Sequence, residues 1–384
     1  MNLYFDNSST SFPKPEGVSQ SINEYFSHGG TYGRAAYNRV IEVSRKVEST
    51  RSLLANLIGT SLAPNVVFTS NATHAINLFI RGMRYPKRRV IISPLEHNAV
   101  CRPLQYLFQT AGVGVDTFPH HPDGRIDIQK AAKVNFASYD LGIINHVSNV
   151  NGVIQPIKEI KRLMGNTPLL VDASQSAGRV EIRADEWKLD ALALTGHKGI
   201  MGPTGTGALF IRNPDMADPL IFGGTGSNSE SYLQPIDLPD RFEAGTPNIV
   251  GIYGLWGALS SGRGYSFKRE HFVELLHEIS TFSSFKLLAA DDTDFQSDVF
   301  SIKPLGMEVS ELARILFEKF SVETRSGLHC APLAHRTLGT FPTGAVRFSL
   351  SKFHTDNDLD YLHSCLKKID EGRKKERFSD INLL

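Results

Sequence analysis

Short apolar runs alternate with longer segments of helical periodicity from about residue 45 to residue 212. The run at 66–68, for example, precedes a segment in which Ile76, Phe79 and Ile80 fall on one face of a helix. The other apolar runs lie at 90–92, 141–145, 169–171, 191–194 and 208–211. Strands this short and this apolar, separated by helices, are typical of a mainly parallel sheet that is covered on both faces. The alternation therefore predicts an α/β fold with such a sheet at its centre.

The pattern changes after residue 250, which predicts a second domain. This part begins with a helical stretch around Leu255, and its later segments are amphipathic helices interleaved with two strand-like runs. The helical segments lie near 268–280, 308–320 and 357–370, and the strand-like runs at 299–302 and 346–350. We interpret this part as a smaller α+β domain. The expected division is an N-terminal segment at 1–14 that packs with the small domain, a large domain at 15–250 and a small domain at 251–384.

The charge balance and the cysteine content restrict the partners and the location that we expect. Forty-one Lys and Arg against 40 Asp and Glu give a formal charge of +1, which offers no footprint for nucleic acid or an anionic membrane. The sequence has no run of eighteen apolar residues, and MNLYFDNSST does not resemble a signal peptide. Three cysteines, a small and odd number, fit a reducing compartment. We therefore expect a soluble cytoplasmic protein.

Ligands bind beyond the carboxyl ends of the strands in a sheet of this kind, and Lys198 follows one predicted strand directly. It stands in TGHKGIMGPTGTG at 195–207, a stretch that holds five glycines. A lysine in this position can form a Schiff base with a carbonyl cofactor, and a plain surface lysine in a glycine-rich loop is the alternative. A P-loop is excluded because its lysine follows the glycines rather than preceding them.

Asp172 ends an otherwise apolar strand in LLVDASQSAG. A carboxylate there needs a cation or hydrogen-bond donors, and the protonated pyridine nitrogen of pyridoxal 5′-phosphate is such a cation. The alternative is an aspartate that caps the next helix. The turn TSNATHA at 69–75 leads from a strand into a helix, so its amides suit a phosphate group, although Ser70 or Asn71 could simply cap the helix.

His97 and Asn149 also follow predicted strands, in EHNAV and HVSNVNG. Taken singly, such a histidine is more often a structural partner than a catalyst, and such an asparagine is a turn residue. Taken together, strand-end Lys, Asp, Asn and His side chains and a phosphate-binding turn supply every contact that pyridoxal 5′-phosphate needs. The set therefore points to this cofactor.

Cys330 lies in RSGLHCAPLAH, with Arg325 five residues before it and His329 beside it. Positive charge of this kind lowers the pKa of a thiol and favours the reactive thiolate, whereas the alternative is a buried and inert cysteine. A metal site through His329, Cys330 and His335 lacks further ligands at recognisable spacing, so we expect no metal. Cys101 and Cys365 have no comparable surroundings, and we expect both to be structural.

Six ordered motifs make the sequence similar to a known group of enzymes: EHNA, HVSNVNG, VDASQSAG, TGHKGIMGPTGTG, RFEAGTPN and RSGLHCA. They resemble the cysteine desulfurase and selenocysteine lyase group of class V aminotransferase-fold enzymes, from YFDNSST at residue 4 to VRFSLSKFHT at residue 346. The last motif resembles the SufS-like branch, which has a short loop at its cysteine, more than the NifS-like and IscS-like branch. The resemblance implies the fold type I of pyridoxal-phosphate-dependent transferases, with a seven-stranded sheet in the large domain, and a homodimer.

The resemblance also implies roles for individual residues. Lys198 resembles the Schiff-base lysine, Asp172 the partner of the pyridine nitrogen, and His97 the histidine that stacks on the ring and assists proton transfer. Cys330 resembles the catalytic cysteine, and Arg325 the arginine that holds the substrate carboxylate. Further cofactor contacts are implied for Gln175, Asn149, Asn71, Ala72, Thr73, Thr195 and His197, and for Thr225, reaching across from the partner subunit. Substrate contacts are implied for Asn149, Asn7 and Arg34.

These roles imply a cysteine desulfurase, a transferase of sulfur metabolism that converts L-cysteine to L-alanine. Lys198 moves the α-proton of the cofactor-bound substrate, and Cys330 attacks the γ-sulfur to become a persulfide, which an acceptor protein collects. The alternatives are a selenocysteine lyase, or a C–S lyase, aminotransferase or epimerase on the same fold. A binding protein without turnover is disfavoured by the intact catalytic set.

The sequence departs from the usual pattern of the group at three places. It has DNSST where the group often has DNAAT, Tyr37 where the group often has a histidine, and a shortened stretch at 260–300. These departures affect the choice of substrate and partner more than the cofactor chemistry.

Overall fold

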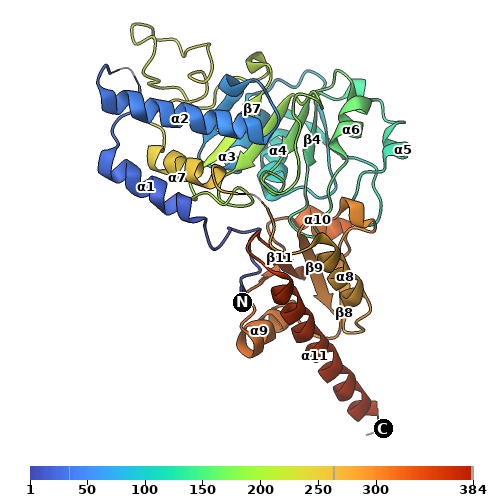
Figure 1. Cartoon of the computed structure of the whole chain (residues 1–384). Coiled ribbons are helices and arrows are strands. Elements are labelled where there is room, and N and C mark those ends of the chain that lie inside the picture. The colour runs from blue at the N-terminus through green and yellow to red at the C-terminus, as the bar shows by residue number, and fades with distance from the viewer. Residues whose placement is uncertain (34, 263, 382–384) are drawn as a thin grey trace.

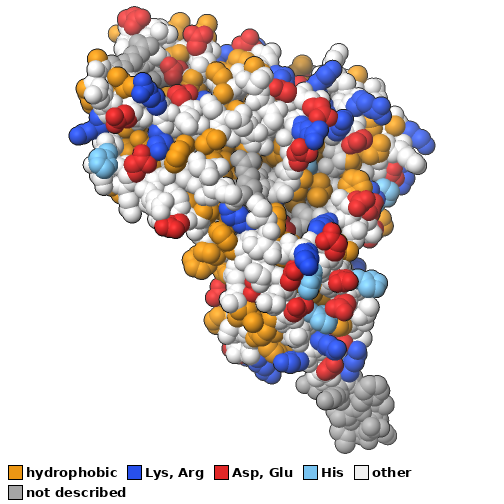
Figure 2. Space-filling view, in the orientation of Figure 1, with side chains coloured by type: hydrophobic (Ala, Val, Ile, Leu, Met, Phe, Trp, Pro, Cys, Tyr) orange, Lys and Arg blue, Asp and Glu red, His pale blue; other side chains and the backbone are white. Residues whose placement is uncertain are grey.

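The chain folds into a larger part, built on a central sheet, and a smaller part that holds a second sheet (Figure 1). The computed structural model describes residues 1–33, 35–262 and 264–381. Arg34, an expected substrate contact, lies outside these residues. Over the visible face, Lys and Arg side chains are interspersed with Asp and Glu (Figure 2), so a field of one sign does not dominate this face.

The central sheet has seven strands in the order β1-β7-β6-β5-β4-β2-β3, and only β7 runs against its neighbours. The strands are β1 (Val66–Thr69), β2 (Arg89–Ile92), β3 (Gly114–Thr117), β4 (Leu141–Asn145), β5 (Leu169–Asp172), β6 (Ala191–Thr195) and β7 (Gly207–Ile211). The predicted α/β fold with a mainly parallel seven-stranded sheet is therefore confirmed. Among the strands of this sheet, the apolar runs missed the edge strand β3, whose residues are half-buried or exposed and therefore carry little apolar signal.

Two apolar clusters cover the two faces of this sheet. Ile144 and Val171 point into one cluster, and their neighbours Ile143 and Leu170 point into the other, because side chains alternate along a strand. The helices of this part are α1 (Glu16–His28), α2 (Asn38–Leu57), α3 (Ala72–Gly82), α4 (Asn98–Ala111), α5 (Ile128–Ala131), α6 (Ile157–Met164) and α7 (Ile249–Leu259). In the described part of the chain, no helix has both the length and the apolar character that a membrane span requires.

Helix α7 packs against α1 and α2, and so lies with the larger part although its residues were expected in the small domain. Its sequence is apolar on nearly all sides, so it can only be stable when surrounded by other elements. Glycines allow its close approach to α1, since a Cβ atom on Gly257 would lie 2.0 Å from the carbonyl oxygen of Gly17. We therefore place the end of the larger part after α7.

The smaller part has an antiparallel sheet in the order β10-β11-β9-β8. Its elements are α8 (Arg269–Ser280), β8 (Phe285–Leu288), β9 (Val299–Pro304), α9 (Val309–Phe320), β10 (Arg325–Gly327), α10 (Pro332–Thr337), β11 (Ala345–Ser349) and α11 (Asp356–Ile381). The N-terminal segment joins this part, because Tyr4 bridges to Glu323 and Asp6 bridges to Ser349, while Phe5 is fully buried in its core.

Candidate active site

One pocket lies beyond the carboxyl ends of the parallel strands and gathers side chains from several loops. It is lined by Asn71, Ala72, Thr73, His97, Ala99, Asn145, Asn149, Asp172, Ser174, Gln175, Thr195, His197 and Lys198. Ten of these thirteen residues are the cofactor contacts that the sequence motifs imply within a single chain. The sheet topology brings them together, because the loops after β2, β4, β5 and β6 all leave the sheet at this edge.

Asp172 ends β5 and keeps one carboxylate oxygen available to the pocket. Its Oδ1 atom accepts hydrogen bonds from the backbone N–H of Ser174 at 2.9 Å and from the Ser174 hydroxyl at 2.5 Å. Its Oδ2 atom has no hydrogen bond with the described residues. No helix follows at residues 173–178, so Asp172 is not a helix cap. Its place in the pocket suits a partner that carries positive charge.

Lys198 follows β6, and its ammonium group is held in a poorly solvated position. Burial lowers the pKa of Lys198 from 10.5 to about 8, against the charge of Asp172, which raises it. The thiolate charge of Cys330 also raises this pKa, so the lysine and the cysteine lie within electrostatic reach of each other. A lysine with a lowered pKa releases its proton readily near neutral pH and then becomes a nucleophile or a base.

His97 caps α4 and lines the pocket at the same time. Its Nδ1 atom accepts a hydrogen bond from the backbone N–H of Ala99 at 3.0 Å. Burial, with the charge of Lys198, lowers the pKa of His97 to about 4, so the ring is neutral. Because Nδ1 accepts, the single proton of the neutral ring is on Nε2. His97 can therefore cap the helix and contact a ligand in the pocket at the same time.

Four buried polar atoms of the pocket residues have no hydrogen-bond partner among the described residues. They are Gln175 Oε1, Asn149 Oδ1, Asn145 Oδ1 and His197 Nδ1. The amide groups of Gln175 and Asn149 are fixed from the other side, because they donate to the carbonyl oxygens of Ser8 and His329 at 3.0 and 2.8 Å. A buried polar atom without a partner costs about 1–3 kcal/mol. This arrangement therefore fits a polar ligand that supplies the missing partners.

The N-terminus of α3 forms another wall of the pocket. Asn71 caps this helix by accepting from the backbone N–H of His74 at 2.9 Å. The N–H groups of Ala72 and Thr73, at the first turn, have no acceptor within the helix, so they suit an anion such as phosphate. A Cβ atom on Gly207 of β7 would lie 2.7 Å from the Cα atom of Asn71, so only glycine allows this turn to pack so closely on the sheet.

Cys330 is exposed at the start of α10 and is tied to the larger part of the chain. Its carbonyl oxygen accepts from the backbone N–H of Asn98, at the first turn of α4, at 2.8 Å. Side chains of α10 and its flanking residues also form a small apolar cluster with the loops that carry His97 and Asn149. The members of this cluster are Leu95, Val150, Val153, Ala331, Ala334 and Leu338.

His329 does not supply the positive charge that we expected beside Cys330. Burial lowers its pKa well below 6.5, and the ring is therefore neutral. Its Nδ1 atom lies 3.2 Å from Nε2 of His335, so these two rings are hydrogen-bonded to each other rather than arranged around a metal. Within the described ranges, no group of three or more His, Cys, Asp or Glu side chains is placed to hold a metal ion.

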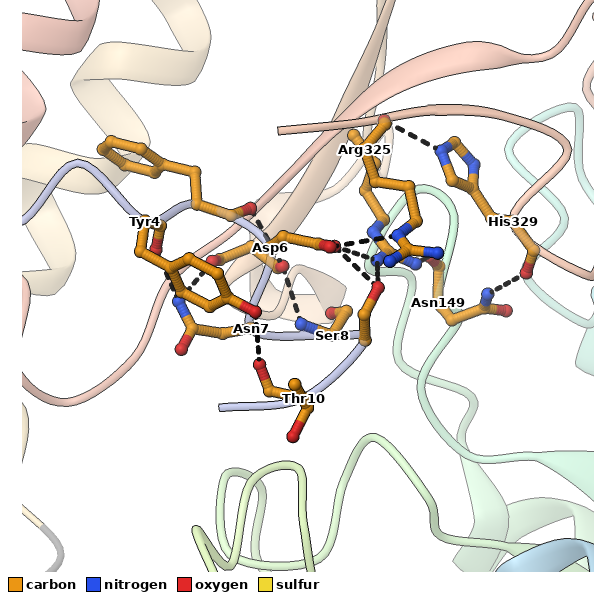
Figure 3. Close-up of polar contacts among 12 residues, drawn as sticks. Tyr4, Asp6, Asn7, Ser8, Thr10, Asn149, Arg325 and His329 are labelled. Atoms are coloured by element: carbon orange, nitrogen blue, oxygen red, sulfur yellow. Dashed lines mark hydrogen bonds and ion pairs between the residues drawn. The ribbon is translucent and has the colours of Figure 1, made fainter. Parts of the chain in front are cut away.

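Arg325 leaves β10 beside this turn and pairs with Asp6 (Figure 3). Its Nε atom donates to Asp6 Oδ2 at 3.0 Å, while Asp6 Oδ1 accepts from the Arg347 guanidinium at 2.7 Å. The Arg325 side chain is 53% exposed, and its terminal nitrogens make no hydrogen bond with the described residues. Asp6 therefore orients the guanidinium of Arg325, and the two terminal nitrogens of that guanidinium stay available to bind a carboxylate.

Asn7 lies in a different position from the one expected. It is fully buried, donates to the carbonyl oxygens of Tyr4 and Ser349 at 2.8 and 3.0 Å, and accepts from the backbone N–H of Phe12 at 3.1 Å. Its amide holds the N-terminal segment in place (Figure 3) and does not line the pocket. The sequence motif did identify the segment, but not which of its side chains, Asp6, acts toward the site.

Thr225 lines a second cavity rather than the pocket of its own chain. This cavity also contains Ser70 and His74, which adjoin the phosphate-binding turn of α3. The Thr225 hydroxyl contacts Ser227 Oγ at 3.0 Å. Five large apolar side chains of the surrounding segment are exposed: Ile221, Phe222, Tyr232, Leu233 and Ile236.

Sequence reasoning missed Glu96, which precedes His97 and is fully buried. Its Oε1 atom accepts from the Ser93 hydroxyl and from the backbone N–H of Asn145, both at 2.7 Å, and thereby links the ends of β2 and β4. Burial, together with the charge of Asp172, raises the pKa of Glu96 from 4.5 to about 8. The available signal was an acid four residues beyond the end of an apolar strand, in the motif EHNA.

Comparisons with known proteins agree with this geometry. The model of the family described as "Aminotransferase class-V" matches residues 3–362. The chain belongs to the class-V aminotransferase family. Two members of comparable length are described as probable cysteine desulfurases. The protein of Methanothermobacter thermautotrophicus is 31% identical over 96% of this chain and 94% of the relative. The protein of Pyrococcus abyssi is 30% identical over 98% of this chain and 96% of the relative.

Solved structures extend the class-V aminotransferase comparison to three dimensions. The apo structure of a cysteine desulfurase from Thermococcus onnurineus has a TM-score of 0.87 and 29% identity, covering 96% of this chain and 95% of that one. The cysteine desulfurase CsdA of Escherichia coli, at 23% identity, has a TM-score of 0.82 over 95% and 94% and supports the fold alone. The resemblance to the cysteine desulfurase group is thus confirmed. Its SufS-like branch stays a prediction.

We predict that Glu96→Gln makes the protein less sensitive to rising pH. The wild-type carboxyl releases its proton near pH 8 when folded but near pH 4.5 when unfolded, so between these values the unfolded state binds fewer protons. The free energy of unfolding of the wild type should therefore fall relative to the Gln variant as pH rises from 4.5 to 8. Urea unfolding at pH 5 and pH 8 measures the difference. Exposed Glu274→Gln is the matched control, and a Glu96→Gln curve parallel to wild type would contradict the assignment.

Proposed function

We propose that this chain is a pyridoxal-phosphate-dependent cysteine desulfurase that converts L-cysteine to L-alanine and holds the sulfur as a persulfide on Cys330. The observation that carries the proposal is the placement of Cys330. Its turn is bonded to Asn98, beside His97, and to Asn149, so the thiol belongs to the same assembly as the pocket with Lys198. The similarity to cysteine desulfurases over nearly the whole chain supports the same activity.

The pocket residues fit the proposed cofactor. Lys198 would bind its carbonyl carbon, Asp172 Oδ2 its pyridine nitrogen, and His97 one face of its ring. The first turn of α3, with Thr195 and His197, would hold its phosphate, and the unpartnered atoms of Gln175 and Asn149 would gain partners. When bound, pyridoxal 5′-phosphate supplies an electron sink for the carbanion chemistry of the substrate.

Residues of the protein itself bind the substrate, move its protons and accept its sulfur. The terminal edge of Arg325 binds the substrate carboxylate, and Asp6 keeps that edge oriented. Lys198, whose pKa is about 8, accepts and returns protons near neutral pH. The Cys330 thiolate forms a bond to the substrate sulfur as the bond from that sulfur to the β-carbon breaks, and the β-carbon keeps the electron pair of the broken bond and takes up a proton. Alanine then leaves, and the exposed persulfide is accessible to an acceptor protein.

We also propose that the protein is a cytoplasmic homodimer in which Thr225 reaches the phosphate-binding turn of the partner subunit. The three cysteines are free, in keeping with a reducing compartment. The cavity beside Thr225 adjoins the turn of α3, and the exposed apolar side chains around it form a surface that a second copy would cover. The SufS-like branch is proposed on the short RSGLHCA motif alone.

Borohydride reduction of the purified holoenzyme should fix the cofactor on Lys198. Hydride converts the reversible bond between a lysine amine and a carbonyl carbon into a stable amine, so mass spectrometry should locate the adduct in the peptide of Lys198. Lys14 is an internal control, because burial lowers its pKa to about 8 as well and it hydrogen-bonds the carbonyl oxygen of His197. An adduct on Lys14, or none, would overturn the cofactor assignment.

Cys330→Ala should retain the bound cofactor and its visible absorbance but lose alanine and sulfide production from cysteine by orders of magnitude, because the nucleophile is removed. Selenide release from selenocysteine should fall less. Cys101→Ala is the matched control, since burial raises the pKa of that thiol to about 12 and it should behave as wild type. A Cys330→Ala protein with wild-type desulfuration would instead make the chain a C–S lyase.

Sedimentation of the holoenzyme should give the mass of a dimer. Leu233→Asp places a charge in the exposed apolar segment and should shift the equilibrium toward the monomer, with loss of cofactor affinity through Thr225. A wild-type monomer that binds the cofactor tightly would refute the shared site.

A further inference from the structure

The turn that carries Cys330 has an unusual backbone. His329 and Cys330 are consecutive non-glycine residues in the left-handed region, with φ of 49° and 55°. Such a backbone conformation is strained for a residue other than glycine, and it persists only where its surroundings hold it. The carbonyl groups of both residues are fixed, by the Asn149 amide and by the backbone N–H of Asn98, at 2.8 Å in each case. The remaining restraint acts on the imidazole ring of His329.

That ring belongs to a chain of hydrogen bonds that ends in buried groups. His329 Nε2 lies 3.1 Å from the carbonyl oxygen of Arg325, and its Nδ1 lies 3.2 Å from His335 Nε2. His335, in α10, is fully buried, and its Nδ1 lies 2.7 Å from the hydroxyl of Thr340. Burial lowers the pKa of His335 to about 4, and burial with the charge of Arg347 lowers the pKa of His329 well below 6.5, so both rings are neutral.

The carbonyl oxygen of Arg325 determines which atom donates in each of these hydrogen bonds. A carbonyl oxygen only accepts, so His329 donates from Nε2, and its Nδ1 carries a lone pair. His335 must then donate from Nε2, which leaves its Nδ1 to accept from the hydroxyl of Thr340. The reverse direction would place two lone pairs against each other between the rings. The Thr340 hydroxyl has one proton, and His335 Nδ1 at 2.7 Å is a nearer acceptor than the His335 carbonyl oxygen at 3.4 Å, so each ring nitrogen in this series of hydrogen bonds has one defined role.

We propose that His335 is a positioning residue for Cys330. By donating to His329, it fixes the imidazole ring of the residue beside Cys330. Because that ring is also bonded to the carbonyl oxygen of Arg325, the distance between the thiol and the carboxylate-binding arginine is kept constant. Helix α10, which carries His335, is held in place because the Thr337 hydroxyl donates to the carbonyl oxygen of Pro94 at 2.9 Å, near His97. The inference relies on the proposed function only for the role of Cys330 as sulfur acceptor.

His335→Phe keeps a ring of similar size but removes both hydrogen bonds. In the holoenzyme, amide hydrogen exchange in residues 325–331 should become faster, while β11 stays protected. The kcat for alanine formation from cysteine should fall tenfold or more, because small displacements of a reacting group are costly, and KM should stay within about twofold. His335→Gln should restore both properties, since its amide can donate to His329 and accept from Thr340.

His354→Phe is the matched control. His354 is also fully buried, and burial lowers its pKa to about 4. Its Nδ1 atom accepts from the backbone N–H of Ser351, however, and takes no part in the hydrogen bonds that link Arg325, His329, His335 and Thr340. It should leave exchange at 325–331 unchanged. Wild-type exchange in folded His335→Phe, equal losses in the Phe and Gln variants, or the same change in His354→Phe would each overturn the proposal. If no form of the protein released alanine, the proposed function would fail, and the exchange data would still decide the positioning role.

Discussion

The buried ion pair between Asp6 and Arg347 joins three separate portions of the chain. Arg347 comes from β11 of the smaller part, Asp6 from the N-terminal segment, and a second guanidinium nitrogen of Arg347 donates to the carbonyl oxygen of Asn149 in the larger part at 3.2 Å. Burial lowers the pKa of Arg347 to about 10, against the opposing effect of Asp6. Breaking a buried pair of this kind costs about 3–5 kcal/mol because a charge is left without a partner. The same aspartate orients Arg325, so the folding of the N-terminus and the geometry of the site depend on one carboxylate.

Burial also determines the charge state of the site. Glu96, His97 and His329 are neutral because their surroundings exclude water, and the pKa of Lys198 is lowered toward neutrality. Burial makes the charged form of each of these groups costly, whereas the lowered pKa of Lys198 lets this amine take up and release a proton near neutral pH. An arrangement of this kind suits chemistry in which one proton moves between carbon and nitrogen, and it was not visible in the motifs, which specify residue types but not their solvation.

Most of the central sheet could be predicted because its strands are buried on both faces and therefore read as unbroken apolar runs. The strands β3, β8 and β10 escaped detection, since each is short and partly exposed. The pocket residues on strand ends were found for the same reason as the strands. Asn7 was misplaced because its amide is bonded to Ser349, far away in the sequence, and His329 was given the wrong charge because the motif does not show that its ring is buried. Thr225 could not be connected to the pocket within one chain, since the proposed contact lies between subunits.

The apolar cluster beneath α10 crosses from one part of the molecule to the other. Ala331, Ala334 and Leu338 follow the cysteine in sequence, but they pack on Leu95 and Val150, which follow strands of the central sheet. The chain connection near residue 260 is therefore a poor place at which to recombine this protein with a relative. A hybrid that exchanged everything after that point would inherit a foreign cysteine turn on an unmatched surface. Such a hybrid could retain both cores and still misalign its thiol, unless the two loops from the sheet were exchanged with it.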